Sequence, residues 1–344
     1  MYSFANDYSE GACPEVMDAL IRDNNTQCPG YGLDQYCALT ARKIRKIVED
    51  SSVDVHLLSA GTPCNVVAIS LLRSHEAVIS VESGHINVHE TGAVEATGHK
   101  IIAVKGENGK ITPEEIEQVV AAHPDEHMVK PKMVFISNAT EFGTIYQKEE
   151  LKKIYETCQR LGLYLYLDGA RLSNALVAIG NDLSLKDICA YTDMFYLGGT
   201  KNGAYAGEIF IIRNDELKPD FRYYEKQHCA MLAKGRFLGT QMLALLENNI
   251  YLSNARNANI MAQALAYIFK QLDFRMYIES PTNQIFPIIE NRLLEKIQNK
   301  YVVTIWGPYD ENHTIVRFVC SWATKKTTIQ EFYSDLVTFL NMPK

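Results

Sequence analysis

The chain has 344 residues and a hydrophobic fraction of 47%, which predict a globular protein with a large domain and a smaller one. Its formal net charge of −7 argues against a nucleic-acid-binding surface, and we see neither a membrane-spanning apolar run nor a signal peptide. The eight cysteines are scattered without Cys-x-x-Cys spacing, so we expect reduced thiols in a cytoplasmic protein and no metal site.

The N-terminal part predicts an arm, a helix and an anion-binding turn. Residues 1–15 are polar and predict an extended arm, and Thr40–Ser52 predicts an amphipathic helix. Val53–Ser59 predicts a strand, and Gly61 and Thr62 follow it where a second helix begins. Free N–H groups and the helix dipole attract an anion at such a turn, and a hydroxyl adds a donor. We therefore predict that Gly61 and Thr62 bind a phosphate, although an ordinary strand-to-helix turn has the same letters.

Strands alternate with helices from about residue 53 to residue 212, which predicts an α/β fold with a mostly parallel sheet flanked by helices. In such sheets, ligands collect at the carboxyl ends of the strands. Gly61, His85, Asp168 and Lys201 each lie just beyond a predicted strand end. We therefore expect these four residues to share one pocket.

The segment Phe195–Gly203 predicts a buried strand followed by a glycine-rich turn that carries Lys201. Burial and a neighbouring cation lower the pKa of a lysine, which is what a Schiff-base lysine needs. Asp168 ends an earlier apolar strand, where on its own it would be interpreted as a helix cap. Pyridoxal phosphate requires a lysine for its aldehyde and an acid beside its pyridine nitrogen. Lys201 and Asp168 together therefore predict a pyridoxal-phosphate site.

The C-terminal part predicts a second, α+β domain. A long helix, Leu243–Gln271, leads into it, and a terminal helix begins at about Thr328. The strands expected between these helices are Gln284–Ile289, Val302–Trp306 and Thr314–Cys320. Arg317 lies mid-strand among apolar residues, where a charge is unfavourable unless paired, and its planar fork suits a substrate carboxylate. We place the large domain at residues 16–249 and the small domain at residues 250–344.

Six segments resemble the threonine aldolase and β-eliminating lyase group of fold-type I pyridoxal-phosphate enzymes. They are Ser59–Asn65, Gly84–Glu90, Asp168–Arg171, Gly199–Gly203, Ala233–Arg236 and Arg317–Trp322. They run from one end of the chain to the other, and the resemblance rests on their order and spacing together. It implies a fold-type I architecture and a homo-oligomer, a dimer or a tetramer, with active sites near the subunit interfaces.

The resemblance also implies roles for further residues. It places His85 on the cofactor ring, although a histidine beyond a strand end is more often a satisfied core residue. Arg171 would help to hold the substrate carboxylate, and Glu90 would support the site. Arg236 and Lys234 would lie near the cofactor phosphate, sometimes across a subunit boundary, although a charge run is usually a solvated face.

Other residues have weaker assignments. Tyr31 resembles a loop tyrosine that approaches a neighbouring subunit's active site, with a plain surface turn as the alternative, and Leu33 stands where the family more often has an acid. Either His123 or His127, or neither, corresponds to a loop histidine that handles the substrate hydroxyl. Three further histidines are interpreted as ordinary surface or helix residues: His75, His89 and His99.

The function that the resemblance implies is cleavage of the Cα–Cβ bond of β-hydroxy-α-amino acids, which turns threonine or allo-threonine into glycine and acetaldehyde. Arg317 and Arg171 would hold the carboxylate, while Lys201, His85 and Asp168 would form the catalytic centre. The base stays open among His85, a loop histidine and bound water.

Four alternatives arise at this point. β-Elimination would start with Lys201 taking the Cα proton, and transamination would use the same residues. A non-catalytic relative of the fold is disfavoured because both Lys201 and Asp168 are present. A nucleotide binder is disfavoured because the turn at Gly61–Val66 lacks the Gly-x-Gly-x-x-Gly pattern.

Overall fold

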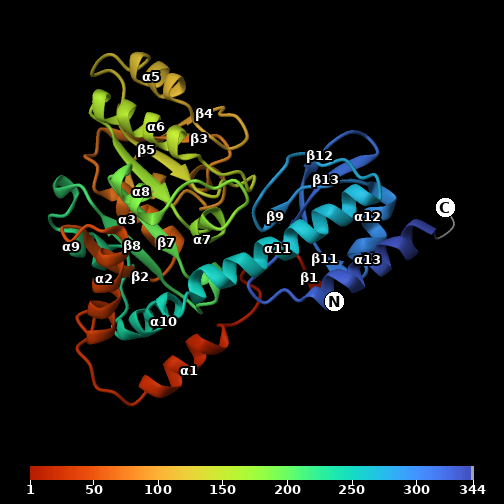
Figure 1. Cartoon of the computed structure of the whole chain (residues 1–344). Coiled ribbons are helices and arrows are strands. Elements are labelled where there is room, and N and C mark those ends of the chain that lie inside the picture. The colour runs from red at the N-terminus through yellow and green to blue at the C-terminus, as the bar shows by residue number, and fades with distance from the viewer. Residues whose placement is uncertain (342–344) are drawn as a thin grey trace.

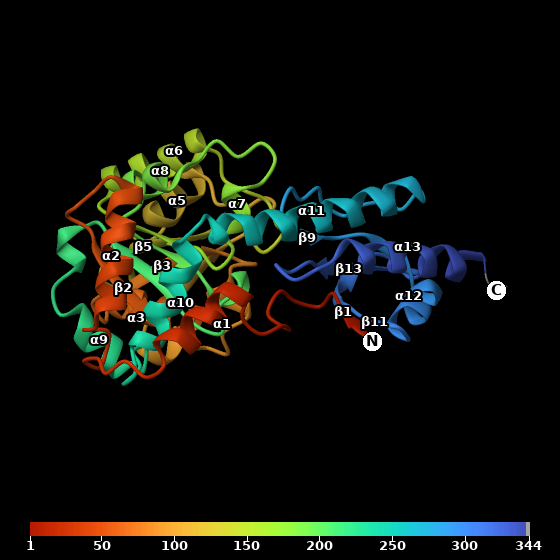
Figure 2. The same cartoon turned by 60° about the horizontal axis from the view of Figure 1, so that its bottom comes forward.

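The computed structural model describes residues 1–341, which form two packed units joined by a long helix (Figures 1 and 2). The larger unit contains a seven-stranded sheet, and the smaller unit contains a four-stranded sheet. Helix α11 (Ile250–Gln271) runs from the larger unit into the smaller one. We keep the boundary between residues 249 and 250 as a proposal, which the start of α11 supports.

The seven-stranded sheet has the strand order β2-β8-β7-β6-β5-β3-β4. In chain order its strands are β2 (Asp54–Leu58), β3 (Glu76–Val81), β4 (Lys100–Val104), β5 (Lys130–Ser137), β6 (Tyr164–Asp168), β7 (Met194–Gly198) and β8 (Glu208–Ile212). Neighbouring strands from β4 to β7 are parallel, whereas β8 is antiparallel to both β2 and β7. The sheet is therefore mostly parallel, and the predicted α/β fold is confirmed.

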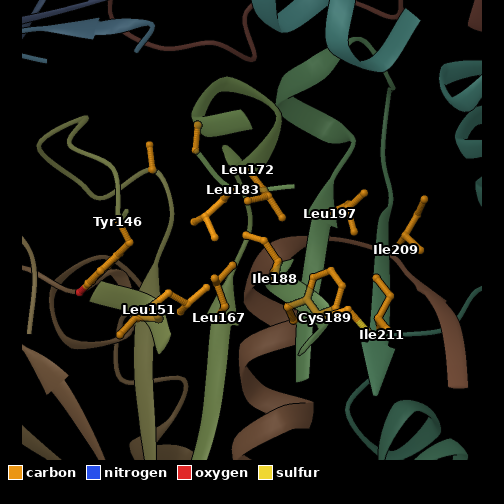
Figure 3. Close-up of a cluster of buried hydrophobic side chains, with 14 of the residues drawn as sticks. Tyr146, Leu151, Leu167, Leu172, Leu183, Ile188, Cys189, Leu197, Ile209 and Ile211 are labelled. Atoms are coloured by element: carbon orange, nitrogen blue, oxygen red, sulfur yellow. The ribbon is translucent and has the colours of Figure 1, made fainter. Parts of the chain in front are cut away.

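Two hydrophobic cores cover the two faces of this sheet, because side chains alternate along each strand. Leu167, Leu197 and Ile211 belong to one core, together with Ile188 and Cys189 of α8 (Leu185–Ala190). Figure 3 shows this group of side chains gathered over β6, β7 and β8.

The second core lies on the opposite face of the sheet. Tyr166, Tyr196 and Phe210 alternate with the residues of the first core and pack against α3 (Gly61–Ser70). Asp168 is two residues beyond Tyr166, so its side chain leaves β6 toward α3 as well. The pleat of the sheet thus decides which helix the acidic residue meets.

The helix predicted at Thr40–Ser52 is present as α2 (Gln35–Val48), and both of its ends lie earlier in the chain than predicted. The helices of the larger unit are α1 (Pro14–Asp23), α2, α3, α4 (His85–Val88), α5 (Pro113–Ala121), α6 (Lys148–Leu161), α7 (Leu172–Leu176), α8, α9 (Phe221–Gln227) and α10 (Arg236–Leu246). The single helix predicted from Leu243 to Gln271 is wrong, because α10 ends at Leu246 and α11 begins at Ile250. Asn248 and Asn249 take positive φ angles of 48° and 61°, a conformation that asparagine tolerates and that ends a helix.

The smaller unit is built on β10-β13-β12, with β9 also paired to β13. Its elements are β9 (Gln284–Ile285), β10 (Ile288–Glu290), α12 (Asn291–Gln298), β11 (Tyr301–Val302), β12 (Thr304–Pro308), β13 (His313–Val319) and α13 (Lys326–Asn341). The strand predicted at Gln284–Ile289 is therefore two short strands, which Phe286 and Pro287 separate, since proline has no N–H to donate.

The N-terminal arm begins inside the smaller unit. Strand β1 (Tyr2–Ser3) pairs in parallel with β11, and the ring of Phe4 is fully buried in the core that also contains Phe269, Phe318 and Phe332. The arm then runs toward the larger unit, where α1 begins at Pro14. The first residues are therefore a strand of the smaller unit and not a free extension.

The sequence also raised the questions of membrane spans and cysteines. Within residues 1–341, no helix is both long enough and apolar enough to cross a membrane. All eight cysteines are free, and six of them are buried. Burial raises the pKa of Cys64, Cys158 and Cys320, so these thiols stay protonated and pack as core residues.

Candidate active site

Seven of the predicted site residues line one cavity of about 400 Å³ between the two units. They are Gly61, Thr62, His85, Asp168, Arg171, Lys201 and Arg317. The first six follow the ends of strands in the large sheet, and Arg317 comes from β13 of the smaller unit. The structure thus brings together the residues that strand ends alone had predicted to share a pocket.

Three residues with predicted site roles lie outside this cavity: Arg236, Tyr31 and Lys234. The guanidinium of Arg236 donates hydrogen bonds to backbone carbonyls in the 23–26 loop that follows α1. Tyr31 is exposed, and the ammonium of Lys226 lies 4.3 Å from the centre of its ring. Lys234 is exposed too. The roles predicted for these residues require a second chain and remain predictions.

Asp168 is buried at the end of β6 and accepts three hydrogen bonds. Its Oδ1 accepts from the hydroxyl of Tyr196 at 2.6 Å and from the backbone N–H of Ala170 at 2.9 Å. Its Oδ2 accepts from Nδ2 of Asn65, on α3, at 3.1 Å. The three donors hold the carboxylate in one orientation, which suits an acid that must face a ring nitrogen.

A hydrogen-bond network links Asp168 to His85 beneath the cavity. Nδ2 of Asn65 donates both to Asp168 and to Oε1 of Glu90, at 2.7 Å from the latter. The same Oε1 lies 2.8 Å from Nδ1 of His85. Glu90 is buried, and this contact fixes the orientation of the imidazole, so the supporting role predicted for Glu90 has a geometric basis.

The other histidines differ from their interpretations in two cases. His89 is exposed but lines the cavity at its rim, 5.5 Å from the ring of His85, so it is more than an ordinary surface residue. His99 is buried rather than on the surface, with its ring nitrogens near a hydroxyl and a backbone carbonyl. His123 and His127 do not line the cavity of their own chain.

Lys201 lies on the short turn Thr200–Asn202 that follows β7. Burial and, second, the nearby guanidinium of Arg171 lower the pKa of Lys201, as the glycine-rich turn led us to expect. The buried carboxylate of Glu208 holds this turn, because it accepts from the N–H of Gly199 and from the hydroxyl of Thr200, both at 2.8 Å. Burial raises the pKa of Glu208 to about 7.

The two arginines of the cavity have different partners. Arg171 forms an ion pair with Asp7 of the N-terminal arm. Arg317 forms no ion pair within the described residues, and its Nε has no hydrogen-bond partner there. The guanidinium of Arg317 lies 5.4 Å from the centre of the Trp306 ring, and burial followed by the charge of Arg171 lowers its pKa to about 10. Arg317 is therefore a cation that lacks an anion.

The N-terminus of α3 fits a phosphate group. No side chain caps this helix at Ala60, and Gly61 and Thr62 face the cavity. A Cβ atom at position 61 would lie 3.1 Å from the hydroxyl oxygen of Tyr196, so glycine keeps the approach to the helix end open. Together with Lys201 and Asp168, these residues fit the groups that pyridoxal phosphate presents: a phosphate, an aldehyde and a pyridine nitrogen.

Sequence reasoning missed several residues of the cavity wall. Glu208 had a visible signal, since it is an acid that opens an otherwise apolar strand. The resemblance implies a site-facing loop at residues 137–144, and Glu141 of this loop is buried against the cavity, where its Oε1 accepts hydrogen bonds from the N–H of His85 and the hydroxyl of Ser137. Asp7 gave no signal, because only the folded chain brings it to Arg171.

Comparisons with known proteins identify the family to which the chain belongs. Residues 4–291 match the sequence family described as β-eliminating lyase. The chain belongs to the β-eliminating lyase family. A low-specificity L-threonine aldolase from a Pseudomonas species is 35% identical to this chain over 342 residues, which cover 97% of this chain and 96% of the relative.

Solved structures show the same fold. A threonine aldolase of Leishmania major superposes with a TM-score of 0.97 at 44% identity, and the match covers 99% of this chain and 100% of that one. A mutant aspartate aminotransferase of Thermus thermophilus superposes with a TM-score of 0.72 at 15% identity, covering 98% and 96% of the two chains, and shows the fold alone. The β-eliminating lyase resemblance and the fold-type I architecture expected from the six segments are both confirmed.

Proposed function

We propose that the protein is a pyridoxal-phosphate-dependent lyase that cleaves the Cα–Cβ bond of β-hydroxy-α-amino acids, with threonine and allo-threonine as substrates. The names of the relatives support this proposal, because the Pseudomonas and Leishmania proteins are threonine aldolases. The observation that carries it is the single cavity in which Lys201, Asp168 and the unpaired Arg317 converge.

The residues of the cavity divide the work of holding the cofactor. When bound, pyridoxal phosphate supplies an electron-accepting ring for the bond that breaks at Cα. Lys201 would hold its aldehyde carbon, and Asp168 would keep its pyridine nitrogen protonated. Gly61 and Thr62 would receive the phosphate at the start of α3, and His85, oriented by Glu90, would lie against the ring.

The substrate would meet the remaining polar groups. Arg317 offers a guanidinium without an anion to the carboxylate of the amino acid, and this contact decides which Cα bond faces the reacting system. The proton of the β-hydroxyl needs an acceptor, and the cavity presents the imidazoles of His85 and His89. Partial desolvation at the cavity rim and then the neighbouring His85 lower the pKa of His89, which favours a neutral ring that can accept a proton.

The test is a product assay with purified protein and pyridoxal phosphate. We expect L-threonine or L-allo-threonine to yield glycine and acetaldehyde, with the aldehyde followed through an alcohol dehydrogenase. A matched protein with Lys201→Ala should release none. If neither amino acid gives aldehyde, while one with a good β-leaving group gives pyruvate and ammonia, the protein is an eliminating lyase and the aldolase proposal is wrong.

We also propose that the protein is a cytoplasmic homo-oligomer in which Arg236 serves the cavity of a neighbouring subunit. Its position outside its own cavity, together with the exposed Tyr31 and Lys234, supports this arrangement, and the free cysteines support a reducing compartment. Mixing Lys201→Ala and Arg236→Ala subunits tests it, since mixed assemblies regain activity only if Arg236 acts across the interface. No regain would assign Arg236 to its own chain.

A further inference from the structure

The N-terminal arm carries a buried acid, Asp7, that contacts Arg171 of the cavity wall. The carboxylate of Asp7 is 1% exposed, and it receives Nε of Arg171 at 2.7 Å and Nη2 at 3.0 Å. This is a two-bond pair along one edge of the guanidinium, the geometry in which an arginine binds a carboxylate most firmly. The Nε–Nη2 edge, one of the two edges with which Arg171 could bind a carboxylate through two hydrogen bonds, is therefore already occupied by the protein itself.

The smaller unit holds Asp7 in this position. Nδ2 of Asn283 donates to Oδ2 of Asp7 at 2.9 Å and to the backbone carbonyl of Cys320 at the same distance. Three residues before Asp7, Phe4 is anchored in the core of the smaller unit. The acid thus bridges the two units, because its partners come from both of them.

The second arginine has the opposite surroundings. Arg317 has one long hydrogen bond, from Nη2 to the carbonyl of Ala5 at 3.4 Å, and an Nε without a partner in the described residues. Next to it, Tyr8 of the arm lines the cavity. The arm therefore gives one guanidinium a full negative charge and the other only a carbonyl oxygen, which leaves the donors of Arg317 for a ligand.

Charge balance around Lys201 follows from the same arrangement. Arg171 lowers the pKa of Lys201, whereas Asp7, Asp168 and Glu208 raise it. Asp7 also has its own pKa held low, in spite of its burial, by Arg171 and then by Lys201. Removal of the Asp7 charge would therefore leave the positive charges of Arg171 and Arg317 less well balanced, and the pKa of Lys201 would fall further.

We propose that Asp7 is a positioning residue of the active site: it occupies the Nε–Nη2 edge of Arg171 and thereby assigns the substrate carboxylate to Arg317. The inference rests on the proposed function, since it concerns the amino acid that the cavity binds. It also revises the role in holding the carboxylate that the resemblance implied for Arg171. The role of Asp7 is to set the orientation of the bound substrate, because a carboxylate drawn to Arg171 would turn Cα away from its reacting position.

The experiment compares the cofactor-loaded parent with Asp7→Asn, which keeps the shape but removes the charge. The pH midpoint of the bound cofactor's visible absorbance should fall by about half a unit or more, because a negative charge near Lys201 is lost. For L-threonine, kcat should fall about tenfold while KM stays within about threefold, since the freed Arg171 still binds the carboxylate but in the wrong place.

Asp335→Asn is the matched control. Asp335 also forms an ion pair, with Lys300 at 2.6 Å, but in the smaller unit and outside the cavity, so its loss should move neither the midpoint nor kcat. If Asp7→Asn does not fold, Asp7→Glu decides, because it keeps the charge and should keep the parent midpoint. A midpoint that stays unchanged in Asp7→Asn, or one that falls in Asp7→Glu, overturns the inference.

Glycine separates this inference from the proposed function, because its binding changes the cofactor spectrum without any turnover. Arg317→Ala should weaken glycine binding at least tenfold, whereas Asp7→Asn should change it less than threefold. Undiminished glycine binding in Arg317→Ala would refute the assignment of the carboxylate. A parent protein that binds glycine but releases no aldehyde from threonine would overturn the proposed function and leave the role of Asp7 standing.

Discussion

Replacement of Glu208 by glutamine should change how the stability of the protein depends on pH. Burial raises the pKa of Glu208 from the ordinary 4.5 to about 7, so the folded protein binds a proton that the unfolded chain has released. The free energy of unfolding therefore falls as pH rises from the pKa of Glu208 in the unfolded chain to its pKa in the folded protein. The loss is nearly complete above about pH 7. With 1.36 kcal/mol per pKa unit, the full effect is about 3 kcal/mol, of which about 2.5 kcal/mol falls between about pH 5 and about pH 8.

The assay is urea unfolding of the cofactor-free parent and of Glu208→Gln at a series of pH values. The cofactor-free form is used because the pKa of about 7 for Glu208 applies to a chain in which Lys201 is a free lysine. The charge of Lys201 lowers the pKa of Glu208, so this charge must be the same in all samples. The free energy of unfolding of the variant should gain about 2.5 kcal/mol on the parent between about pH 5 and about pH 8. Glu290→Gln, which removes an exposed acid of the smaller unit, should show no such trend. A difference between parent and Glu208→Gln that is constant with pH would refute the reasoning.

Three further substitutions test the cavity. Asp168→Asn should keep the cofactor, seen by absorbance, but lose most turnover, because a neutral partner no longer favours ring protonation; near-normal kcat would remove Asp168 from the mechanism. Arg317→Ala should weaken substrate binding by about 1.5–3 kcal/mol and leave cofactor affinity intact, whereas unchanged kcat/KM would make the arginine structural. Gly61→Ala should weaken cofactor binding in a fluorescence titration, because its Cβ would crowd the hydroxyl of Tyr196 at 3.1 Å; parent-like affinity would place the phosphate elsewhere.

Local sequence patterns were enough to predict the sheet and the cavity residues that lie at the ends of its strands. The alternation of apolar strands and helices fixes a mostly parallel sheet, and the ends of parallel strands meet at one edge. For this reason Gly61, His85, Asp168 and Lys201 could be assigned to one cavity from their places in the sequence.

Contacts between distant segments could not be predicted in this way. Asp7 meets Arg171 across 164 residues, and neither residue carries a local mark of the other. The break between α10 and α11 was missed because Asn248 and Asn249 are tolerated in a helix and reveal their positive φ only in the folded chain. Glu208 shows the intermediate case, since its place in an apolar strand was visible but its partners on the lysine turn were not.

The pairing of β1 with β11 has a consequence for the order in which the chain acquires its form during synthesis. Tyr2 lies beside Tyr301, so β1 must wait for a strand that is synthesised much later. The strands of the large sheet, from residue 54 to residue 212, are all made before that partner exists. The great length of this loop adds little to the entropic cost of closing it, because that cost grows only with the logarithm of loop length. The consequence is therefore a delay in pairing and not a loss of stability. Until β11 is made, Asp7 is not held at Arg171, so the nascent protein would have a formed lysine turn but an incomplete binding site.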